Sequence, residues 1–456
     1  MALRMAAATC SCKGTGLGGR FPPSDWYYSH CDYTLAQSGA KSSFSVPFRD
    51  TAELTGGAMM PMVRRIGAVA AVTMTLMLAA SPSMALSSTP SSSSPASSTG
   101  KQRTTATSTR QPQDVDDVYF LNPSVGWASE DNSARLLMTT DGGAHWRDVS
   151  PPMLRQTGFV LARGLAGGAF LSPADFWVSV FDLGPDKSLP AFVFHTTDGG
   201  VRWARAGSFP ASDDQTWLRF GDDRQGWAVV GHGQLMGIEA VTVYETTSSG
   251  RRWSVISRSS TPSAAGTPGG PSLYCDKSGL SLSGTEASPI LWLTGASGGP
   301  PCLARSTDGG RRWTDVGLPN PSQTDGGEAW PPVFSSRSNG ALAVWYGTAH
   351  GAVTAVYSTT SGGATWVEHR LPSAKPGPMD VVSSTTWFAA SGKTLYRTTN
   401  GGARWSRVSA SVNFGNYQSP NTLDFVNTVD GWAVVDGQVW HTTDGGHVWS
   451  SKGFST

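Results

Sequence analysis

Charge is scarce in this chain of 456 residues: charged residues make up 15%, with 34 Lys and Arg against 33 Asp and Glu. So even a balance gives no electrostatic reason to expect nucleic acid as a partner. Cysteine is also rare, with 5 residues, and no helical periodicity runs through positions 114–456. Glycine (54), proline (29) and tryptophan (18) are abundant instead. This mixture is typical of an all-β protein with many short strands and tight turns.

The longest apolar run lies well inside the chain. Residues 60–85 contain Arg64 and Arg65, an apolar run over 66–80, and a small-x-small site at 83–85. This is the layout of a secretory signal peptide cleaved after Ala85. The run of about 15 residues is shorter than the ~20 that a membrane-spanning helix needs. We expect translation to start at Met60 or Met62, which makes residues 1–59 a doubtful, non-native leader. The alternative is an uncleaved anchor, the one route by which we expect membrane contact.

Residues 86–113 are rich in Ser, Thr and Pro and almost devoid of apolar side chains. Such a segment cannot bury enough surface to fold, so it is predicted to be a disordered linker. Together with the signal peptide it indicates a secreted or extracytoplasmic protein of the periplasm or cell wall. Only Cys275 and Cys302 lie beyond the linker. An even pair outside the cytoplasm favours a disulfide over a metal or catalytic site.

One octapeptide of pattern S/T-x-D-x-G-x-x-W recurs seven times between positions 139 and 449, about 50 residues apart. Its third position is occupied by Asp141, Asp198, Ser248, Asp308, Ser361, Asn400 and Asp444. Its last position is occupied by Trp146, Trp203, Trp253, Trp313, Trp366, Trp405 and Trp449. Each copy has an upstream Phe-x₆-Trp spacing or a degenerate form of it, with Trp292 and Trp387 marking two units whose leads are altered.

The alternation of apolar residues around these motifs has the period of strands, four in each unit. Seven units of four short strands predict a seven-bladed β-propeller of antiparallel blades over residues 114–456. The first unit begins near Val115 and the last ends soon after Trp449. We therefore expect the first and last blades to meet directly, each complete in itself.

The octapeptide itself has the composition of a tight turn. Its Asp can accept backbone N–H groups, its Thr or Ser can hold the other side of the turn, and its glycines permit positive φ. Ser and Asn still accept hydrogen bonds but make poor acids, so a structural role is favoured at all seven copies. The histidines near these turns lack metal-ligand spacing. We expect no metal and no cofactor.

The octapeptide resembles the Asp-box, or bacterial neuraminidase repeat, which in its superfamily is a structural turn away from the ligand face. The segments 423–449 (LDFVNTVDGWAVVDGQVWHTTDGGHVW) and 395–405 (LYRTTNGGARW) are most similar to the photosystem II stability/assembly factor-like family. That resemblance implies a non-enzymatic chaperone on the outer side of an energy-transducing membrane. It favours an exported scaffold, expected to be a monomer, that binds an envelope protein or protein complex, or less often a glycan.

The alternative is a sialidase or another exo-glycosidase of the same superfamily. A sialidase needs an Arg triad, a Tyr–Glu pair and an acid/base Asp, and its first Arg usually lies in an [F/Y]-R-I-P motif. That motif is missing here, and Tyr417 has no convincing Glu partner in the sequence. We therefore favour a non-catalytic protein.

Partner binding in propellers uses the face around the central channel. The residue before each repeat Phe should point toward it: Tyr119, Ala169, Arg219, Val333 and Asp424. Arg155, Arg163 and Arg219 are candidates for a basic partner-binding patch, with scattered solvated arginines as the alternative. Trp217 and Trp330 fall outside the repeat positions. They either anchor a partner or sugar as exposed rings or pack between blades.

Overall fold

The computed structural model describes residues 9–11, 29–37, 40–48, 114–184, 190–210, 215–235, 238–259, 269–272, 274–285, 287–319, 326–348, 351–371, 378–409, 411–414 and 423–451. The chain divides into two units, Met1–Thr104 and Thr105–Thr456. In the first, β1 (Thr9–Ser11), β2 (Ser29–Gln37) and β3 (Ala40–Phe48) form an antiparallel sheet in that order. The predicted signal peptide (60–85) and linker (86–113) lie outside the described residues. No helix in the described part is both long and apolar enough to span a membrane.

The second unit is all-β in its described residues, apart from the single 3-10 turn η1 (Gly164–Gly167), and its paired strands are antiparallel. Four sheets hold four strands each, in chain order, and three of them are given first. They are β4 (Val115–Phe120), β5 (Gly126–Glu130), β6 (Arg135–Thr139) and β7 (Arg147–Asp148); β26 (Met379–Val381), β27 (Trp387–Ser391), β28 (Thr394–Thr398) and β29 (Ser406–Ser409); and β30 (Leu423–Phe425), β31 (Gly431–Val435), β32 (Gln438–Thr442) and β33 (Ser450–Ser451).

The remaining strands follow the same order with local additions. One sheet contains β8 (Phe159–Leu161), β9 (Ala169–Phe170), β10 (Phe176–Asp182), β11 (Ala191–Thr196) and β12 (Ala204–Phe209), and β8 and β9 both pair with β10. The next contains β13 (Thr216–Phe220), β14 (Gly226–Leu235), β15 (Ile238–Thr246) and β16 (Ser254–Arg258).

A nine-stranded sheet contains two antiparallel runs joined by one strand. The first run is β17 (Asp276–Thr285), β18 (Ser288–Ser297), β19 (Cys302–Ser306) and β20 (Thr314–Asp315). The second is β22 (Val333–Phe334), β23 (Gly340–Thr348), β24 (Gly351–Thr359) and β25 (Val367–Arg370). Strand β21 (Gly326–Ala329) pairs with both β18 and β23 and so connects the runs.

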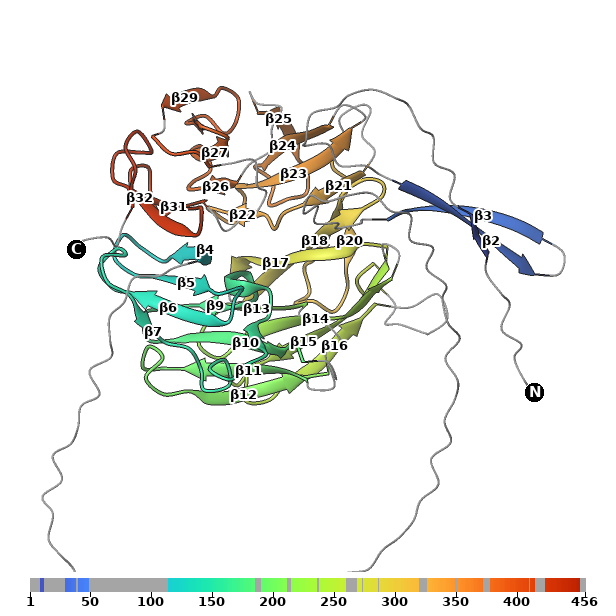
Figure 1. Cartoon of the computed structure of the whole chain (residues 1–456), viewed down its shortest axis with the longest axis horizontal. Coiled ribbons are helices and arrows are strands. Elements are labelled where there is room, and N and C mark those ends of the chain that lie inside the picture. Colours follow the sequence, from blue (N-terminus) through green and yellow to red (C-terminus); the bar gives the residue numbers. More distant parts are fainter. Residues whose placement is uncertain are drawn as a thin grey trace, which may run out of the picture. The chain divides into compact units, whose positions relative to one another are not determined.

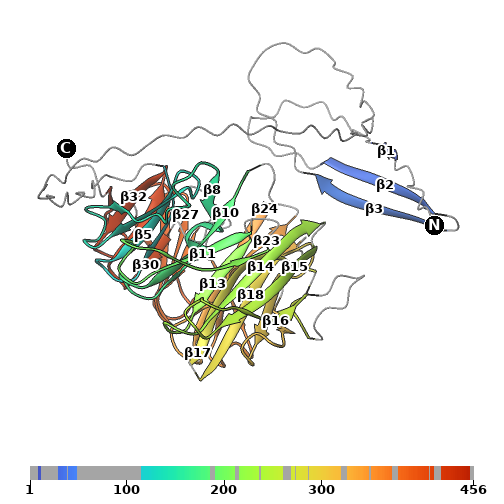
Figure 2. The ribbon, with the colours of Figure 1, turned by 90° about the horizontal axis from the view of Figure 1, so that it is seen from below.

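These sheets stand around a common centre as a β-propeller. Figure 1 shows the strands following one another around it, and Figure 2 shows the same sheets turned by 90°. Strands β4, β9, β13, β17, β22, β26 and β30 are innermost, and most neighbouring members of this set contact one another. The ring closes where the red β30–β33 sheet meets the cyan β4–β7 sheet (Figure 1). Both are built from continuous chain segments, which confirms the expectation that the first and last sheets meet directly and are each complete.

Aromatic stacking repeats between neighbouring sheets. A Phe on one innermost strand lies flat on the indole of the preceding sheet: Phe220 stacks on Trp177 with ring centroids 3.9 Å apart, and Phe120 stacks on Trp432 at 3.7 Å. Phe425 stacks in the same way on Phe388, also at 3.7 Å. The repeat indole of that unit is therefore replaced by Phe388, and the assignment of Trp387 to this position is wrong by one residue. Register shows why, because Val381 pairs with Trp387 where Phe425 pairs with Gly431.

All seven octapeptides fold into the same turn. The hydroxyl of the first residue accepts the N–H of the glycine four positions later, as Thr442 does from Gly446 at 3.0 Å. The third residue accepts the N–H four positions after it, and this bond is kept when Asp is replaced: Ser361 accepts Thr365 N at 2.9 Å, and Asn400 accepts Arg404 N at 2.8 Å. At Asp444 the N–H of Val448 helps to hold the pKa of the carboxyl below its usual value. The repeated element is thus a hydrogen-bond acceptor rather than an acid.

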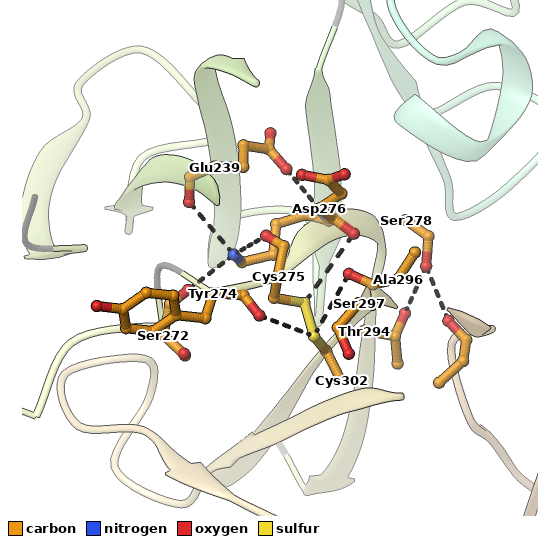
Figure 3. The surroundings of a disulfide bond; sticks show 12 residues. Glu239, Ser272, Tyr274, Cys275, Asp276, Ser278, Thr294, Ala296, Ser297 and Cys302 are labelled. Carbon is orange, nitrogen blue, oxygen red and sulfur yellow. Dashed lines mark hydrogen bonds between the residues drawn. A yellow bond between two sulfur atoms is a disulfide. The ribbon is translucent and has the colours of Figure 1, made fainter. Parts of the chain in front are cut away.

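The predicted disulfide between Cys275 and Cys302 is confirmed, with Cα atoms 6.0 Å apart (Figure 3). Cys275 precedes β17 and Cys302 begins β19, so the bridge passes over the intervening β18. A Cβ on Gly295 of β18 would lie 2.5 Å from Cys275 Sγ, so glycine is what leaves room there. Beside the bridge, the buried Lys277 Nζ donates to the carbonyl oxygens of Cys275 and Ser272 at 2.6 and 2.8 Å.

We expect the Cys275→Ser/Cys302→Ser double variant to lose about 3–4 kcal/mol of unfolding free energy, because the bridge restricts the unfolded chain. Urea unfolding followed by tryptophan fluorescence measures this loss. Reductant should lower the stability of the parent protein by a similar amount and leave the double variant unchanged. Equal stability of the two proteins without reductant would contradict the prediction.

Candidate functional site

A cavity of about 610 Å³ occupies the centre of the propeller. Its lining comes from every innermost strand, together with η1 and the segment around Trp330. All five residues predicted to face the channel line it: Tyr119, Ala169, Arg219, Val333 and Asp424. Because the cavity gathers side chains from sequence positions roughly 300 residues apart, it is the candidate site.

Two more residues occupy the same structural position. In each sheet the cavity-facing residue pairs with the repeat aromatic position of the next strand, as Tyr119 does with Trp127 and Asp424 with Trp432. Asp380 pairs with Phe388, and Ser281 pairs with Trp292, and both line the cavity. The sequence pattern missed them because Val381 and Leu282 stand where the other units have Phe. The aromatic residue of the second strand would have located them, because its pairing partner on the innermost strand is the residue that faces the cavity.

Asp380 and Asp424 are the acidic pair of the cavity. Asp380 accepts the N–H of Phe425 at 2.6 Å and that of Val381 at 2.7 Å. Asp424 in turn accepts the N–H of Phe120 on β4. Each carboxylate thus reaches the backbone of the next innermost strand. Burial raises the pKa of Asp380 to about 6, and burial and the charge of Asp380 raise the pKa of Asp424 well above its usual value.

Arg219 is held by carbonyl oxygens rather than by a carboxylate. Its Nη1 donates to the carbonyl oxygens of Leu218, Ala166 and Gly168 at 2.6, 2.9 and 3.0 Å. Burial lowers its pKa to about 10, so the guanidinium remains charged at neutral pH. Tyr119, 37% exposed, is the more accessible ring here, and burial of its hydroxyl and the charge of Asp424 raise its pKa.

The three arginines predicted to form a basic patch have separate partners. Arg163 lies at the N-terminal end of η1 with its guanidinium 5.5 Å from the centre of the Trp217 ring. Arg155, in the connection between β7 and β8, donates to the carbonyl of Ser150 at 3.1 Å and lies 3.4 Å from Asp148. Each guanidinium, Arg219 included, therefore has a carbonyl, a ring or a carboxylate as a contact of its own.

Trp217 and Trp330 are buried, with 0% and 7% of their surface exposed. Trp217 packs with Trp227 and Leu280, and Trp330 packs with Val356 and Met379. Of the two alternatives for these rings, packing is the one that the structure shows: both indoles line the cavity wall from within the packed core. Large apolar rings between converging sheets gain more from burial than from exposure.

The ionisable residues lie at the ends of the innermost strands nearest the octapeptide turns. After Phe120 the chain enters a turn in which Ser124 O accepts the N–H of Gly142, at 2.8 Å. The same bond joins Val429 and Gly445 in the last sheet, at 2.9 Å. The polar residues of the channel therefore lie at the strand ends that adjoin these turns.

Within the described part of the chain, no three His, Cys, Asp or Glu side chains cluster as metal ligands would. The histidines near the turns have local partners: His195 Nε2 lies 2.6 Å from Asp175 Oδ1, and His145 Nδ1 lies 2.7 Å from Asp141 Oδ2. Tyr417, the tyrosine considered for a sialidase mechanism, lies outside the described residues.

No family model matches the chain, and no curated protein matches it. Solved structures resemble it. YCF48 from Cyanidioschyzon merolae has a TM-score of 0.49 at 16% identity, covering 73% of this chain and 96% of that one. The GH93 alpha-L-arabinofuranosidase of Fusarium graminearum has a TM-score of 0.39 at 11% identity, covering 63% and 92%. The GH74 enzyme of Niastella koreensis has a TM-score of 0.38 at 12% identity, covering 74% of this chain and 65% of that one. At these identities the likeness concerns the fold alone, which the strand pairings establish independently.

Proposed function

We propose that the chain is an exported, seven-bladed Asp-box propeller that acts as a non-catalytic scaffold and binds an envelope protein at its channel. Export rests on the signal-peptide pattern of residues 60–85, and the blade number rests on the seven octapeptides and seven innermost strands. The photosystem II assembly factor-like resemblance supports a scaffold role without specifying the partner. No cofactor is part of the proposal.

The proposal rests on one observation: the polar side chains of the cavity are hydrogen-bonded to the protein backbone. Asp380, Asp424 and Arg219 are each bonded to the backbone of their own or the adjacent innermost strand or of η1. These bonds fix the ring of strands, whereas a catalytic acid and base must be directed at a substrate. The most exposed side chains that line the cavity are an aromatic and an aliphatic one, with Tyr119 37% and Val333 45% exposed. An aromatic and an aliphatic side chain at the mouth of a rigid ring suit a protein partner.

Affinity capture from solubilised envelope tests the scaffold function, with the full chain tagged and the variants Tyr119→Ala and Val333→Ser. We expect one stable protein partner, its recovery falling about tenfold or more for each variant, because truncating a contact at the centre of an interface costs upward of ~1.4 kcal/mol. Val201→Ser is the matched control, since Val201 is 72% exposed on an octapeptide turn. Partner recovery unchanged by both cavity variants, or lowered equally by the control, would contradict binding at the channel.

A second candidate is an exo-glycosidase such as a sialidase, or a glycan-binding module. It is favoured by one observation: two carboxyl groups with raised pKa share the cavity with a tyrosine. Incubation with a panel of fluorogenic glycosides, a sialoside among them, separates the candidates. Turnover that is abolished by Asp424→Asn would replace the scaffold proposal with the enzyme. Glycan-array binding without turnover, lost in Tyr119→Ala, would identify the module.

A further inference from the structure

A second pocket, here called the side pocket, lies between the β13–β14 turn and the end of the β17–β18 hairpin. Leu282 lines both the side pocket and the central cavity, so the two are neighbours. The volume of the side pocket is about 630 Å³. Small-molecule sites have volumes of about 300–1,000 Å³, so the side pocket is large enough for a ligand of that size.

The β17–β18 hairpin forms one wall of the side pocket because it is longer than its counterparts. In the β4–β5 and β13–β14 hairpins, strand pairing ends at Phe120 and Phe220. Leu282 has the corresponding place in β17, and here the pairing continues to Thr285. The extension brings Ser283 and Thr285 to the side pocket.

Leu282 and Trp227 form the floor of the side pocket, and both belong to one packed cluster. At five other interfaces a Phe of the innermost strand packs against the aromatic ring of the preceding sheet. These residues are Phe120, Phe170, Phe220, Phe334 and Phe425. Leu282 takes this place beside Trp227, and because its side chain is smaller, part of the space above the indole stays unfilled.

Gly221 leaves the opposite wall of the side pocket open. It directly follows β13, and its N–H donates to Gln225 O at 3.0 Å, as the N–H of Leu121 donates to the carbonyl four positions later at 2.9 Å. Leu121 packs against the hydrophobic core of the first sheet, and Leu171 does so in the second. Gly221 has no side chain with which to cover Trp227 in the same way.

The backbone does not require a glycine at position 221. Its φ is outside the left-handed region, and a Cβ there would lie 3.6 Å from Leu282 Cδ2 and 3.8 Å from Trp227 Cζ3, which are ordinary contact distances. The effect of Gly221 is therefore to keep the side pocket open. A ligand atom at the position of that Cβ would touch both side chains of the floor.

Three uncharged polar side chains complete the side pocket. Ser283 Oγ accepts the N–H of Trp292 Nε1 at 2.9 Å, so its own proton can be donated to a ligand. Gln225 Nε2 donates to Glu245 Oε1 at 3.2 Å, which leaves the amide oxygen of Gln225 as an acceptor. The hydroxyl of the exposed Thr285 can both donate and accept.

Charge is missing from the described residues that line the side pocket. Glu245, the partner of Gln225, has its own counter-charge, since its Oε2 lies 2.8 Å from Arg311 Nη2. A charged ligand would lose hydration in the side pocket without gaining an opposite charge. The lining therefore suits a neutral ligand that has an apolar face and a rim of hydroxyl groups.

We propose that the side pocket is a binding site for a neutral sugar residue of a glycan. The apolar face of the sugar ring lies over Leu282 and Trp227 at the open side of Gly221. Its hydroxyl groups, each a donor and an acceptor, bond to Ser283 and Gln225. The site is distinct from the channel and does not depend on the protein partner proposed there.

Glycan-array binding of the full chain, followed by calorimetric titration with a bound neutral oligosaccharide, tests the site. We expect the parent protein to bind neutral oligosaccharides in preference to sialylated ones. Gly221→Leu should bind at least about tenfold more weakly, because its side chain occupies the pocket. Its thermal midpoint should not fall below that of the parent, since Leu121 and Leu171 fill the same place elsewhere.

Thr285→Val is a second variant, which keeps the shape of an exposed side chain and removes its hydroxyl. We expect its affinity to be lower by about threefold to tenfold, the effect of one hydrogen bond. Because this change lies on the surface, it tests the site even where Gly221→Leu alters folding.

Gly317→Leu is the matched control, because it adds the same side chain at an exposed glycine where a Cβ meets no atom within 4 Å. It should bind as the parent does. The proposal is overturned if the parent binds no neutral oligosaccharide, or binds only sialylated ones. It is also overturned if Gly221→Leu and Thr285→Val keep the parent affinity. Loss of glycan binding in Tyr119→Ala alone would place the glycan in the channel and likewise overturn it.

Discussion

Trp432→Ala is expected to lower the free energy of unfolding by about 3–5 kcal/mol, a loss typical of truncating a fully buried aromatic side chain. The indole is fully buried, it stacks on Phe120 with centroids 3.7 Å apart, and its Nε1 donates to Gly142 O. Truncation removes the packing, the stacking and the hydrogen bond from the interface between the β30–β33 and β4–β7 sheets at once. Urea unfolding at a fixed pH measures the loss.

Trp432→Phe provides the matched control, because the chain already uses phenylalanine at this position of another sheet. Phe388 stacks on Phe425 at 3.7 Å as Trp432 does on Phe120. We expect the Phe variant to lose roughly 1–2 kcal/mol, mainly the hydrogen bond to Gly142 and part of the buried area. A loss of less than ~1 kcal/mol for Trp432→Ala would show that the contacts of Trp432 between the β30–β33 and β4–β7 sheets are not needed for stability.

Gly363→Ala is expected to be nearly as damaging, at about 2–4 kcal/mol. Gly363 is the second glycine of its octapeptide turn and has a φ of +80°. A Cβ there would overlap the buried ring of Trp292. Backbone strain and overlap with a tightly packed indole therefore add.

The control for this substitution is Gly298→Ala, since a Cβ on Gly298 meets no atom within 4 Å and its φ is not positive. Its stability should change by less than about 0.5 kcal/mol. Thermal unfolding of the two variants beside the parent protein gives the comparison. Equal midpoints for Gly363→Ala and the parent would mean that the turn can shift away from Trp292 without cost.

Sequence periodicity was sufficient to predict the repeated strands, the octapeptide turns and five of the residues that line the cavity. The Phe-x₆-Trp spacing located Tyr119 and Asp424 because each strand has a period of two residues and the Phe fixes its phase. It failed where the Phe is replaced: Val381 hid Asp380, and the neighbouring Trp387 was taken for the aromatic that Phe388 supplies. A shift of one residue reverses the side of the strand on which a residue points.

The bonding of the cavity residues could not be obtained in this way. Asp424 accepts a hydrogen bond from Phe120, 304 positions away along the chain, and no local pattern encodes such a pair. The same holds for Trp217, whose position outside the repeat left both an exposed and a packed ring open. Its burial follows from the convergence of β13, β14 and β17, which only the closed ring brings about.

The continuity of the chain through each terminal sheet has a consequence for how the protein is made. Because β4–β7 is complete without any strand from the C-terminal end, it can form as soon as its own residues have been synthesised. Domains emerging N-terminal end first are exposed to aggregation through unpaired strand edges. Here neither terminal sheet needs a strand from the other end of the chain to complete its pairing. Each later sheet packs against one that has already formed, until the last sheet contacts the first.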